Sequence, residues 1–165
     1  MSNSFVKMSL CSLHHYRHNI ASALRYEYLL KPTDTVALLS PNNIDYLPIC
    51  LATAMCGAKV TPLNPLYKAD EVVTILDRSS SKVLFTHTKL LSVALPAVMK
   101  SKTVDHIVVI PDAEKNDEIP FGSVDFRTLV EYKHSPNLEN SVDDVHYHVK
   151  DVNSHPWLLP YSSGK

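Results

Sequence analysis

Short apolar runs alternate along this chain with segments whose apolar residues recur at helical spacing. The run at 36–39 is hydrophobic throughout and is closed by Ser40-Pro41-Asn42-Asn43. A strand that is apolar on both faces is typical of a parallel sheet covered by helices on each side. Similar runs lie at 59–63, 82–86 and 106–110, and helical segments lie at 13–30, 44–56, 69–78 and 90–100. This alternation predicts an α/β fold with three layers, in which helices flank a largely parallel sheet.

Proline, asparagine and glycine mark the predicted ends of these elements. Pro32 ends the first helix, and Gly57 ends the second, for which Asn43 is a suitable N-cap. Asn64-Pro65 predicts a turn after the second strand. Pro96 interrupts the pattern of the fourth helix.

The pattern changes after Pro111, where polar residues become more frequent. We expect a surface loop at 112–123, a short helix at 126–132, an irregular connection at 134–156 and a last strand at 157–161. A strand that enters a small-residue turn, here Ser162-Ser163-Gly164-Lys165, normally leads to further structure.

Composition excludes several classes of protein. The chain has 165 residues, enough for one well-buried domain, and its net charge of −1 gives no electrostatic reason to expect nucleic acid as a partner. Its 3 glycines are far apart, so a GxGxxG dinucleotide loop is impossible. The 3 cysteines have no CxxC spacing and indicate reduced thiols in an intracellular protein. No apolar run approaches the ~20 residues of a membrane span.

Three stretches of the sequence resemble the adenylate-forming acid–CoA ligases (AMP-binding family) of the 4-coumarate–CoA ligase and firefly luciferase type. The stretch 34–43, DTVALLSPNN, resembles the early strand of that family, which ends in Pro-Asn. Gly57-Ala58 and 62–67, PLNPLY, resemble its strand entry and its Asn-Pro turn. The stretch 159–164, LPYSSG, resembles the opening of its phosphate-binding loop. The resemblance covers nearly the whole chain from about Leu13 onward.

The resemblance implies candidate ATP-binding residues, namely Ser162, Ser163 and Gly164. Backbone N–H groups in a small-residue turn, together with hydroxyl groups, can approach the β- and γ-phosphate oxygens closely. Lys165 stands where the family has a Thr, and it therefore does not match the lysine that occurs later in the family's loop. A Walker A motif does not fit either, because no glycine lies five residues before Gly164.

The resemblance also implies an incomplete fold and an incomplete active site. We expect 1–165 to be a partial N-terminal domain, with a core at about 13–110, an irregular connection at 111–156, and a strand with a truncated loop at 157–165. Full-length members of the family adenylate a carboxylic acid with ATP and Mg²⁺ and then transfer the acyl group to CoA. Their acyl pocket, adenine contacts and catalytic lysine lie downstream of the loop. We therefore expect a fragment that is inactive alone and contains no catalytic residue.

Two other hypotheses remain. The chain could be a catalytically silent α/β interaction module derived from this family, or an unrelated doubly wound domain such as a flavodoxin-like receiver. A receiver needs acidic residues at its strand ends, and Ser40, Asn64 and His87 stand there instead. The default compartment is cytoplasmic, and the family makes the peroxisome the alternative. The sequence leaves the carboxylic acid and the oligomeric state open.

Two pairs of histidines lie close together in the sequence, as metal ligands often do. His14 and His18 are four residues apart on a predicted helix, but they have no evident third ligand. His146 and His148 match no known ligand pattern. We interpret both pairs as solvated polar surface and predict no metal site.

The cysteines of the second helix and the lone tryptophan have structural interpretations. Cys50 and Cys56 lie on an apolar helical pattern, which predicts buried, inert thiols. Trp157 precedes the last strand and is predicted to be a core anchor rather than a stacking platform.

Overall fold

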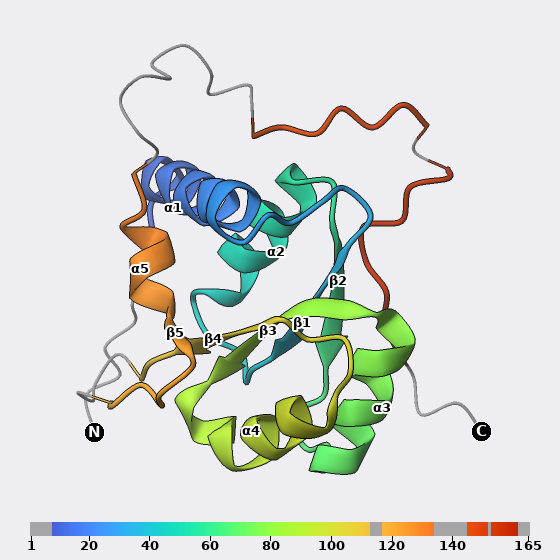
Figure 1. Cartoon of the computed structure of the whole chain (residues 1–165). Helices are drawn as coiled ribbons and strands as arrows, with labels where there is room; N and C mark the ends of the chain where they lie inside the picture. The colour runs from blue at the N-terminus through green and yellow to red at the C-terminus, as the bar shows by residue number, and fades with distance from the viewer. Residues whose placement is uncertain (1–7, 113–116, 134–144, 152, 162–165) are drawn as a thin grey trace.

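Five strands form one sheet in the order β2-β1-β3-β4-β5, and every neighbouring pair is parallel (Figure 1). The computed structural model describes residues 8–112, 117–133, 145–151 and 153–161. The strands are β1 (Thr35–Leu39), β2 (Lys59–Leu63), β3 (Ser81–His87), β4 (His106–Ile110) and the short β5 (Val124–Asp125). The predicted parallel α/β fold is confirmed.

Helices cover both faces of the sheet and complete the three layers. One face carries α1, α2 and α5, and the other carries α3 and α4 (Figure 1). The helices are α1 (Leu10–Ser22) with its π-helical continuation η1 (Ala23–Glu27), α2 (Tyr46–Met55), α3 (Ala69–Ser79), the 3₁₀ turn η2 (Thr88–Leu90), α4 (Leu91–Lys100) and α5 (Phe126–Val130).

Strand β1, which has a neighbouring strand on each side, shows why the run at 36–39 is apolar throughout. Val36 and Leu38 pack in the cluster beneath α1 and α2, whereas Ala37 and Leu39 pack in the cluster beneath α3 and α4. Successive side chains of a strand point to opposite faces, so a strand between two helical layers needs apolar residues at every position. All five residues of β1 are buried.

The cysteine prediction is confirmed in the layer beneath α1. Cys50 and Cys56 are both buried, and Cys56 Sγ lies 3.4 Å from the carbonyl oxygen of Ala21. Burial raises the pKa of the Cys50 thiol to about 11 and that of Cys56 to about 12. Because the thiolate is the reactive form, both side chains act as small apolar groups at neutral pH.

Helices α1 and α2 begin two or more residues away from their predicted starts. Helix α1 begins at Leu10, because the Ser9 side chain accepts a hydrogen bond from the backbone N–H of Ser12 at 3.0 Å. Helix α2 begins at Tyr46, two residues later than predicted. The prediction that Asn43 is the N-cap is wrong, because the residue directly before α2 is Asp45. Asn43 Oδ1 accepts the backbone N–H of Asp45 at 2.9 Å in a turn that precedes the helix.

Pro96 lies inside α4 without ending it. A proline at this position leaves the carbonyl of Ser92 without its helical donor. Ser92 and Pro96 are both on the exposed side of the helix, where water can serve that carbonyl. The interruption expected from the sequence is therefore absent.

The predicted last strand is reduced to one parallel bridge between Leu158 and Val60 of β2. Trp157 is 51% exposed, so the prediction that it anchors the core is wrong. The segment 157–161 lies at the outer edge of the sheet, where a side chain is covered on one side at most.

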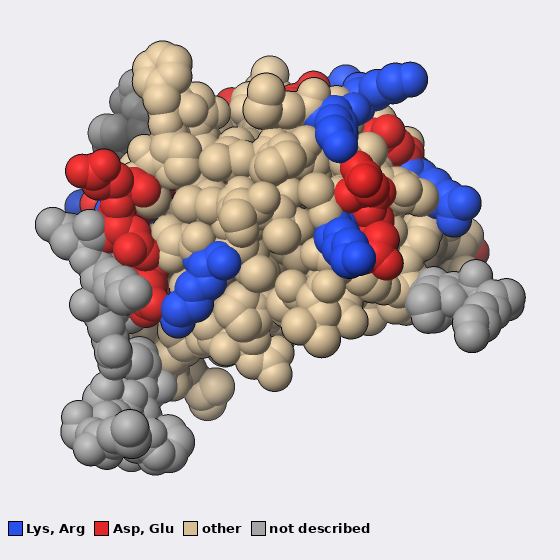
Figure 2. Space-filling model, turned by 90° about the horizontal axis from the view of Figure 1, so that it is seen from below, with Lys and Arg blue, Asp and Glu red and all other residues tan. Residues whose placement is uncertain are grey.

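Charge on the face seen in Figure 2 is mixed rather than segregated. Basic and acidic side chains lie next to each other at its margin, around a broad uncharged area. Between α3 and α4, Lys100 Nζ lies 2.8 Å from Asp70 Oδ1. Exposed pairs of this kind contribute little to stability.

Candidate functional site

The carboxyl ends of the parallel strands meet at one edge of the sheet. Strand β1 connects through α2 to β2 on one side, whereas β3 connects through α4 to β4 on the other. The connections therefore diverge between β1 and β3. In open α/β sheets, ligands bind outside the carboxyl ends of the strands at such a point.

The segment 157–161 reaches the same edge alongside β2. The backbone N–H of Val60 donates to the carbonyl of Trp157, and the N–H of Leu159 donates to the carbonyl of Val60, each at 2.8 Å. The hydroxyl of Thr61 donates to the carbonyl of Leu159 at 2.8 Å. Tyr161 packs against the cluster beneath α3 and α4. The chain thus pairs in parallel with β2 at 157–159, and Tyr161 follows two residues later.

The three residues predicted to bind ATP come directly after Tyr161. Ser162, Ser163 and Gly164 lie outside the described residues. The structure therefore brings the chain to the carboxyl edge of the sheet, and the role of these three residues stays a prediction.

The turn after β1 is held by its own side chains. The Asn43 Nδ2 group donates to Ser40 Oγ at 2.8 Å, and Ser40 Oγ donates to the carbonyl of Pro41 at 2.9 Å. Both side chains are engaged within the turn, which fixes the backbone where the connections diverge.

The neighbouring strand β3 ends in two buried polar residues. His87 is 6% exposed, and its Nδ1 accepts the backbone N–H of Lys89 at 3.2 Å. Burial lowers the pKa of His87, and the Lys89 charge lowers it further, whereas Asp112, Asp117 and Asp45 oppose the change. The Oγ1 of Thr86 is buried and has no hydrogen-bond partner in the described part of the chain. A neutral imidazole and an unpaired hydroxyl therefore lie at the end of this strand.

Asp45 lies close enough to His87 for each to affect the other's pKa. Its Oδ1 accepts the hydroxyl of Tyr16 at 3.0 Å. Burial raises the pKa of Asp45, while the Tyr16 hydrogen bond and the charge of His87 lower it. Burial also raises the pKa of Tyr16, with the charge of Asp45 as the second cause. This partly buried carboxyl can accept hydrogen bonds, but when ionised it would repel a phosphate.

Asp45, Tyr16 and His87 did not emerge as candidate site residues from the sequence. Their signal is topological: Asp45 lies in the connection after β1, and His87 ends β3. The strand order needed to apply the carboxyl-edge rule is itself a property of the fold.

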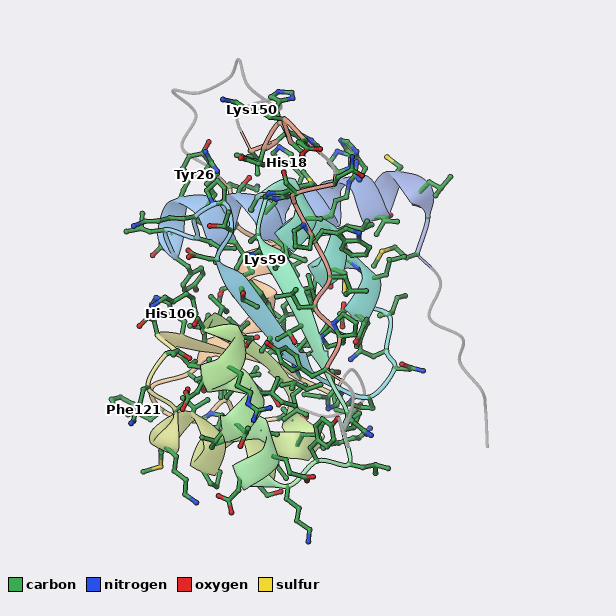
Figure 3. All side chains as sticks on the ribbon, turned by 90° about the vertical axis from the view of Figure 1, so that its right-hand side faces the viewer. His18, Tyr26, Lys59, His106, Phe121 and Lys150 are labelled. Carbon is green, nitrogen blue, oxygen red and sulfur yellow. The ribbon has the colours of Figure 1, made fainter. Side chains whose placement is uncertain are left out.

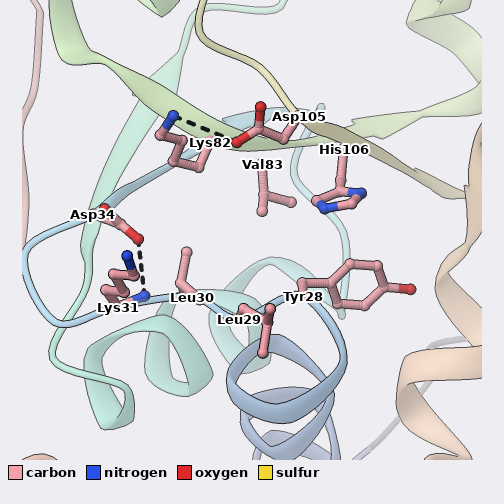
Figure 4. Close-up of a pocket in the computed structure, with 9 residues that line it drawn as sticks. All are labelled: Tyr28, Leu29, Leu30, Lys31, Asp34, Lys82, Val83, Asp105 and His106. Atoms are coloured by element: carbon pink, nitrogen blue, oxygen red, sulfur yellow. Dashed lines mark hydrogen bonds and ion pairs between the residues drawn. The ribbon is translucent and has the colours of Figure 1, made fainter.

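A hollow of about 380 Å³ lies at the opposite, amino edge of the sheet (Figure 4). Asp34 precedes β1 there and Asp105 precedes β4. Lys82 Nζ lies 3.4 Å from Asp105 Oδ2, and the rings of Tyr28 and His106 are 5.0 Å apart on the other side. The hollow is remote from the carboxyl ends of the strands, and its Lys82 is already paired with Asp105. We therefore place no nucleotide there.

The predicted solvated histidines are only partly solvated. His14 and His15 are exposed, but His18 is half-buried and its Nε2 has no accessible surface and no partner among the described residues. Burial lowers the pKa of His18, with neighbouring histidines as further causes. Within the described ranges, no group of three or more His, Cys, Asp or Glu side chains could hold a metal ion.

Comparison with known proteins decides the family. The sequence model of the AMP-binding enzyme family matches residues 3–164. The chain belongs to this family. Probable CoA ligase CCL9 of Humulus lupulus is 33% identical over 112 residues, which are 68% of this chain and 19% of that protein. 4-Coumarate–CoA ligase-like 8 of Arabidopsis thaliana is 30% identical over 146 residues, 88% of this chain and 24% of that protein.

This member of the AMP-binding family thus spans about a fifth to a quarter of the length of these two curated relatives. Its fold is that of a solved relative, the acetoacetyl-CoA synthetase from Streptomyces lividans. The TM-score is 0.80 over 96% of this chain and 24% of that one, at 24% sequence identity. At this identity the likeness shows the fold alone. Across the described residues, no helix is long and apolar enough to cross a membrane.

Proposed function

We propose that the chain supplies the N-terminal part of an acid–CoA ligase, including the first residues of its ATP phosphate loop. The whole protein would adenylate a carboxylic acid with ATP and Mg²⁺ and transfer the acyl group to CoA. The observation that supports this proposal is the path of segment 157–161. It runs parallel to β2 and reaches the carboxyl edge of the sheet at Tyr161, directly before Ser162-Ser163-Gly164.

The three loop residues would bind the β- and γ-phosphates of ATP. Their backbone N–H groups and two hydroxyls are donors of the kind that phosphate oxygens accept. Held phosphates would leave the α-phosphate free for attack by the carboxylate. The partly buried carboxyl of Asp45 would repel a phosphate placed near His87, which favours a phosphate site on the β2 side of the edge.

We propose that these 165 residues have no ligase activity by themselves. The adenine-contacting segment, acyl pocket and catalytic lysine of the resembled family lie downstream of its phosphate loop. Three loop residues cannot orient the reacting groups, and orientation is a large part of catalysis.

The proposal is tested by grafting residues 1–165 onto the remainder of a curated CoA ligase and measuring ATP–pyrophosphate exchange. We expect exchange in the chimera and none in the isolated chain. Lys165→Thr, which restores the family residue, should lower the KM for ATP. Ser162→Ala with Ser163→Ala should raise it. A folded chimera that lacks exchange even with Thr at position 165 would refute the proposal.

A second candidate is a catalytically silent interaction module. The observation that favours it is Lys165, which departs from the family's loop. Under this hypothesis Lys165→Thr would leave the chimera inactive.

For the compartment, we propose the cytoplasm, with the peroxisome as the alternative. The free and buried Cys50 and Cys56 suit a reducing environment, and a fluorescent fusion would test the assignment.

A further inference from the structure

Gly57, just after α2, is covered by the ring of Tyr147. Its φ is +72°, a conformation that side-chain-bearing residues rarely adopt. A Cβ built on Gly57 would lie 2.5 Å from Cγ and 2.8 Å from Cβ of Tyr147, closer than real carbon contacts. The glycine therefore permits both its own backbone turn and the close approach of the aromatic ring.

Three further contacts fasten the segment around Tyr147 to this corner. The backbone N–H of Tyr147 donates to the carbonyl of Met55 at 2.8 Å. His155 Nε2 donates to the carbonyl of Gly57 at 2.9 Å, and the His155 ring stacks on Tyr147 with 5.3 Å between centroids. Val145, at the start of the segment, is 2% exposed. We call Gly57, Tyr147 and His155 the clasp.

The clasp lies directly before the segment that approaches the candidate loop. Trp157 is two residues after His155, and Val60 is three residues after Gly57, and these two are the first hydrogen-bonded pair between the segment and β2. Figure 3 shows the C-terminal segment running from near Lys150 past Lys59 on β2. Trp157 and Val60 therefore each lie two or three residues after a residue of the clasp.

Few contacts pair the segment with β2 beyond the clasp. They consist of one bridge and the Thr61 hydrogen bond, and Trp157 and Leu158 remain 51% and 39% exposed. Edge segments with few buried contacts open with low free energy. The clasp supplies burial and stacking that the bridge lacks.

We propose that the clasp is a positioning device that holds segment 157–161 in register on β2 and thereby sets the affinity of the loop for a nucleotide polyphosphate. The second half of this proposal rests on the proposed function. The clasp residues act through the segment and do not touch the nucleotide.

The chain offers a matched pair of variants. Gly57→Ala places a methyl group against Tyr147, whereas Gly122→Ala has a similar backbone, with φ +82°, and nothing within 4 Å. Both variants are strained by the positive φ, and only the first disturbs the clasp. Hydrogen exchange of the Leu159 amide, which bonds to Val60, reports on the segment. We expect about tenfold faster exchange in Gly57→Ala and less than about twofold change in Gly122→Ala.

Variants of Tyr147 keep the proposal testable if Gly57→Ala fails to fold. Tyr147→Ala should speed Leu159 exchange about tenfold, and Tyr147→Phe, which keeps the stacked ring, should not. The amide of Phe85 in β3 should be unchanged in both, because a positioning role is local. Equal exchange at Leu159 in the alanine and phenylalanine variants would overturn the clasp.

Nucleotide affinity separates the clasp from the proposed function. We would titrate the chimera of residues 1–165 with the remainder of a curated CoA ligase, and its Tyr147 variants, with MgATP by calorimetry. Tyr147→Ala should weaken binding about tenfold, and Tyr147→Phe should restore it. If the chimera with unaltered residues 1–165 binds no ATP, the proposed function fails, and the hydrogen exchange of Leu159 still decides the role of the clasp. If Leu159 is released but ATP affinity stays unchanged, the positioning role is refuted.

Discussion

The central strands and the segment 157–161 lie in the same sheet but are held by different means. Strand β1 has a neighbour on each side and helices on both faces, and its residues are buried. The segment has a neighbouring strand, β2, on one side only and pairs with it through a single bridge, and its Trp157 is exposed. Burial of apolar area stabilises the former, whereas a few hydrogen bonds and the clasp place the latter. The candidate loop thus follows the less firmly held part of the sheet.

The largest expected difference between these regions is in core packing. Phe85 of β3 has no exposed surface and packs edge-on against Phe126, with 6.1 Å between ring centroids. Phe85→Ala should reduce the free energy of unfolding by about 3–5 kcal/mol, because it loses apolar burial and leaves a cavity. Urea denaturation measures the loss.

Phe121 provides the control for this substitution, because its side chain is fully exposed. Phe121→Ala should change the free energy of unfolding by no more than about 0.5 kcal/mol. Similar losses for the two alanine variants would mean that the strands are not the stable part of the molecule.

A smaller effect is expected where the core holds the edge segment. Thr61→Val removes the hydroxyl that donates to the carbonyl of Leu159 and keeps the shape of the side chain. The loss should be about 1 kcal/mol, and Leu159 exchange should become faster. Thr53→Val is the control, since Thr53 donates to Ile49 within α2. Its substitution should leave Leu159 exchange unchanged, and a faster rate there would contradict a local role for Thr61.

The buried end of β3 should make stability depend on pH. Burial holds the pKa of His87 below its ordinary 6.5. At pH values between the lowered pKa and 6.5, the folded chain therefore binds fewer protons than the unfolded chain. Stability should therefore fall as pH decreases from 6.5 through the lowered pKa. His87→Asn should flatten this slope in urea midpoints measured between pH 7 and 5, about the range in which histidine titrates.

The connecting segment supplies the control for the pH prediction. His148 is exposed, and His148→Asn should leave the pH slope as it is in the unaltered chain. His18 is also half-buried with a lowered pKa, so some slope should remain after His87 is replaced. An unchanged slope in His87→Asn would show that His87 is not protected from water.

The sequence predicts the core strands far better than the edge. The predicted bounds 59–63 and 106–110 agree with β2 and β4. In β4 the signal is the continuous apolar run 107–110, whose side chains are buried alternately in the clusters on the two faces of the sheet. The sequence around Tyr147 and His155 has no such pattern. Their partners Met55 and Gly57 lie almost a hundred residues earlier in the chain and are brought close only by folding. Asp45 and His87 are brought near each other for the same reason. Asn43 is not the N-cap of α2, because residues 44 and 45 form a turn before the helix begins at Tyr46.

The smallest effect is expected for the tryptophan at the edge. As a core anchor, Trp157 would cost about 3–5 kcal/mol on truncation to alanine. With 51% of its surface exposed and its pairing made through the backbone, Trp157→Ala should cost less than about 1 kcal/mol. Circular dichroism in urea measures this without relying on tryptophan fluorescence. A loss as large as that of Phe85→Ala would mean that the edge segment is covered in solution, and the contrast between the two regions would disappear.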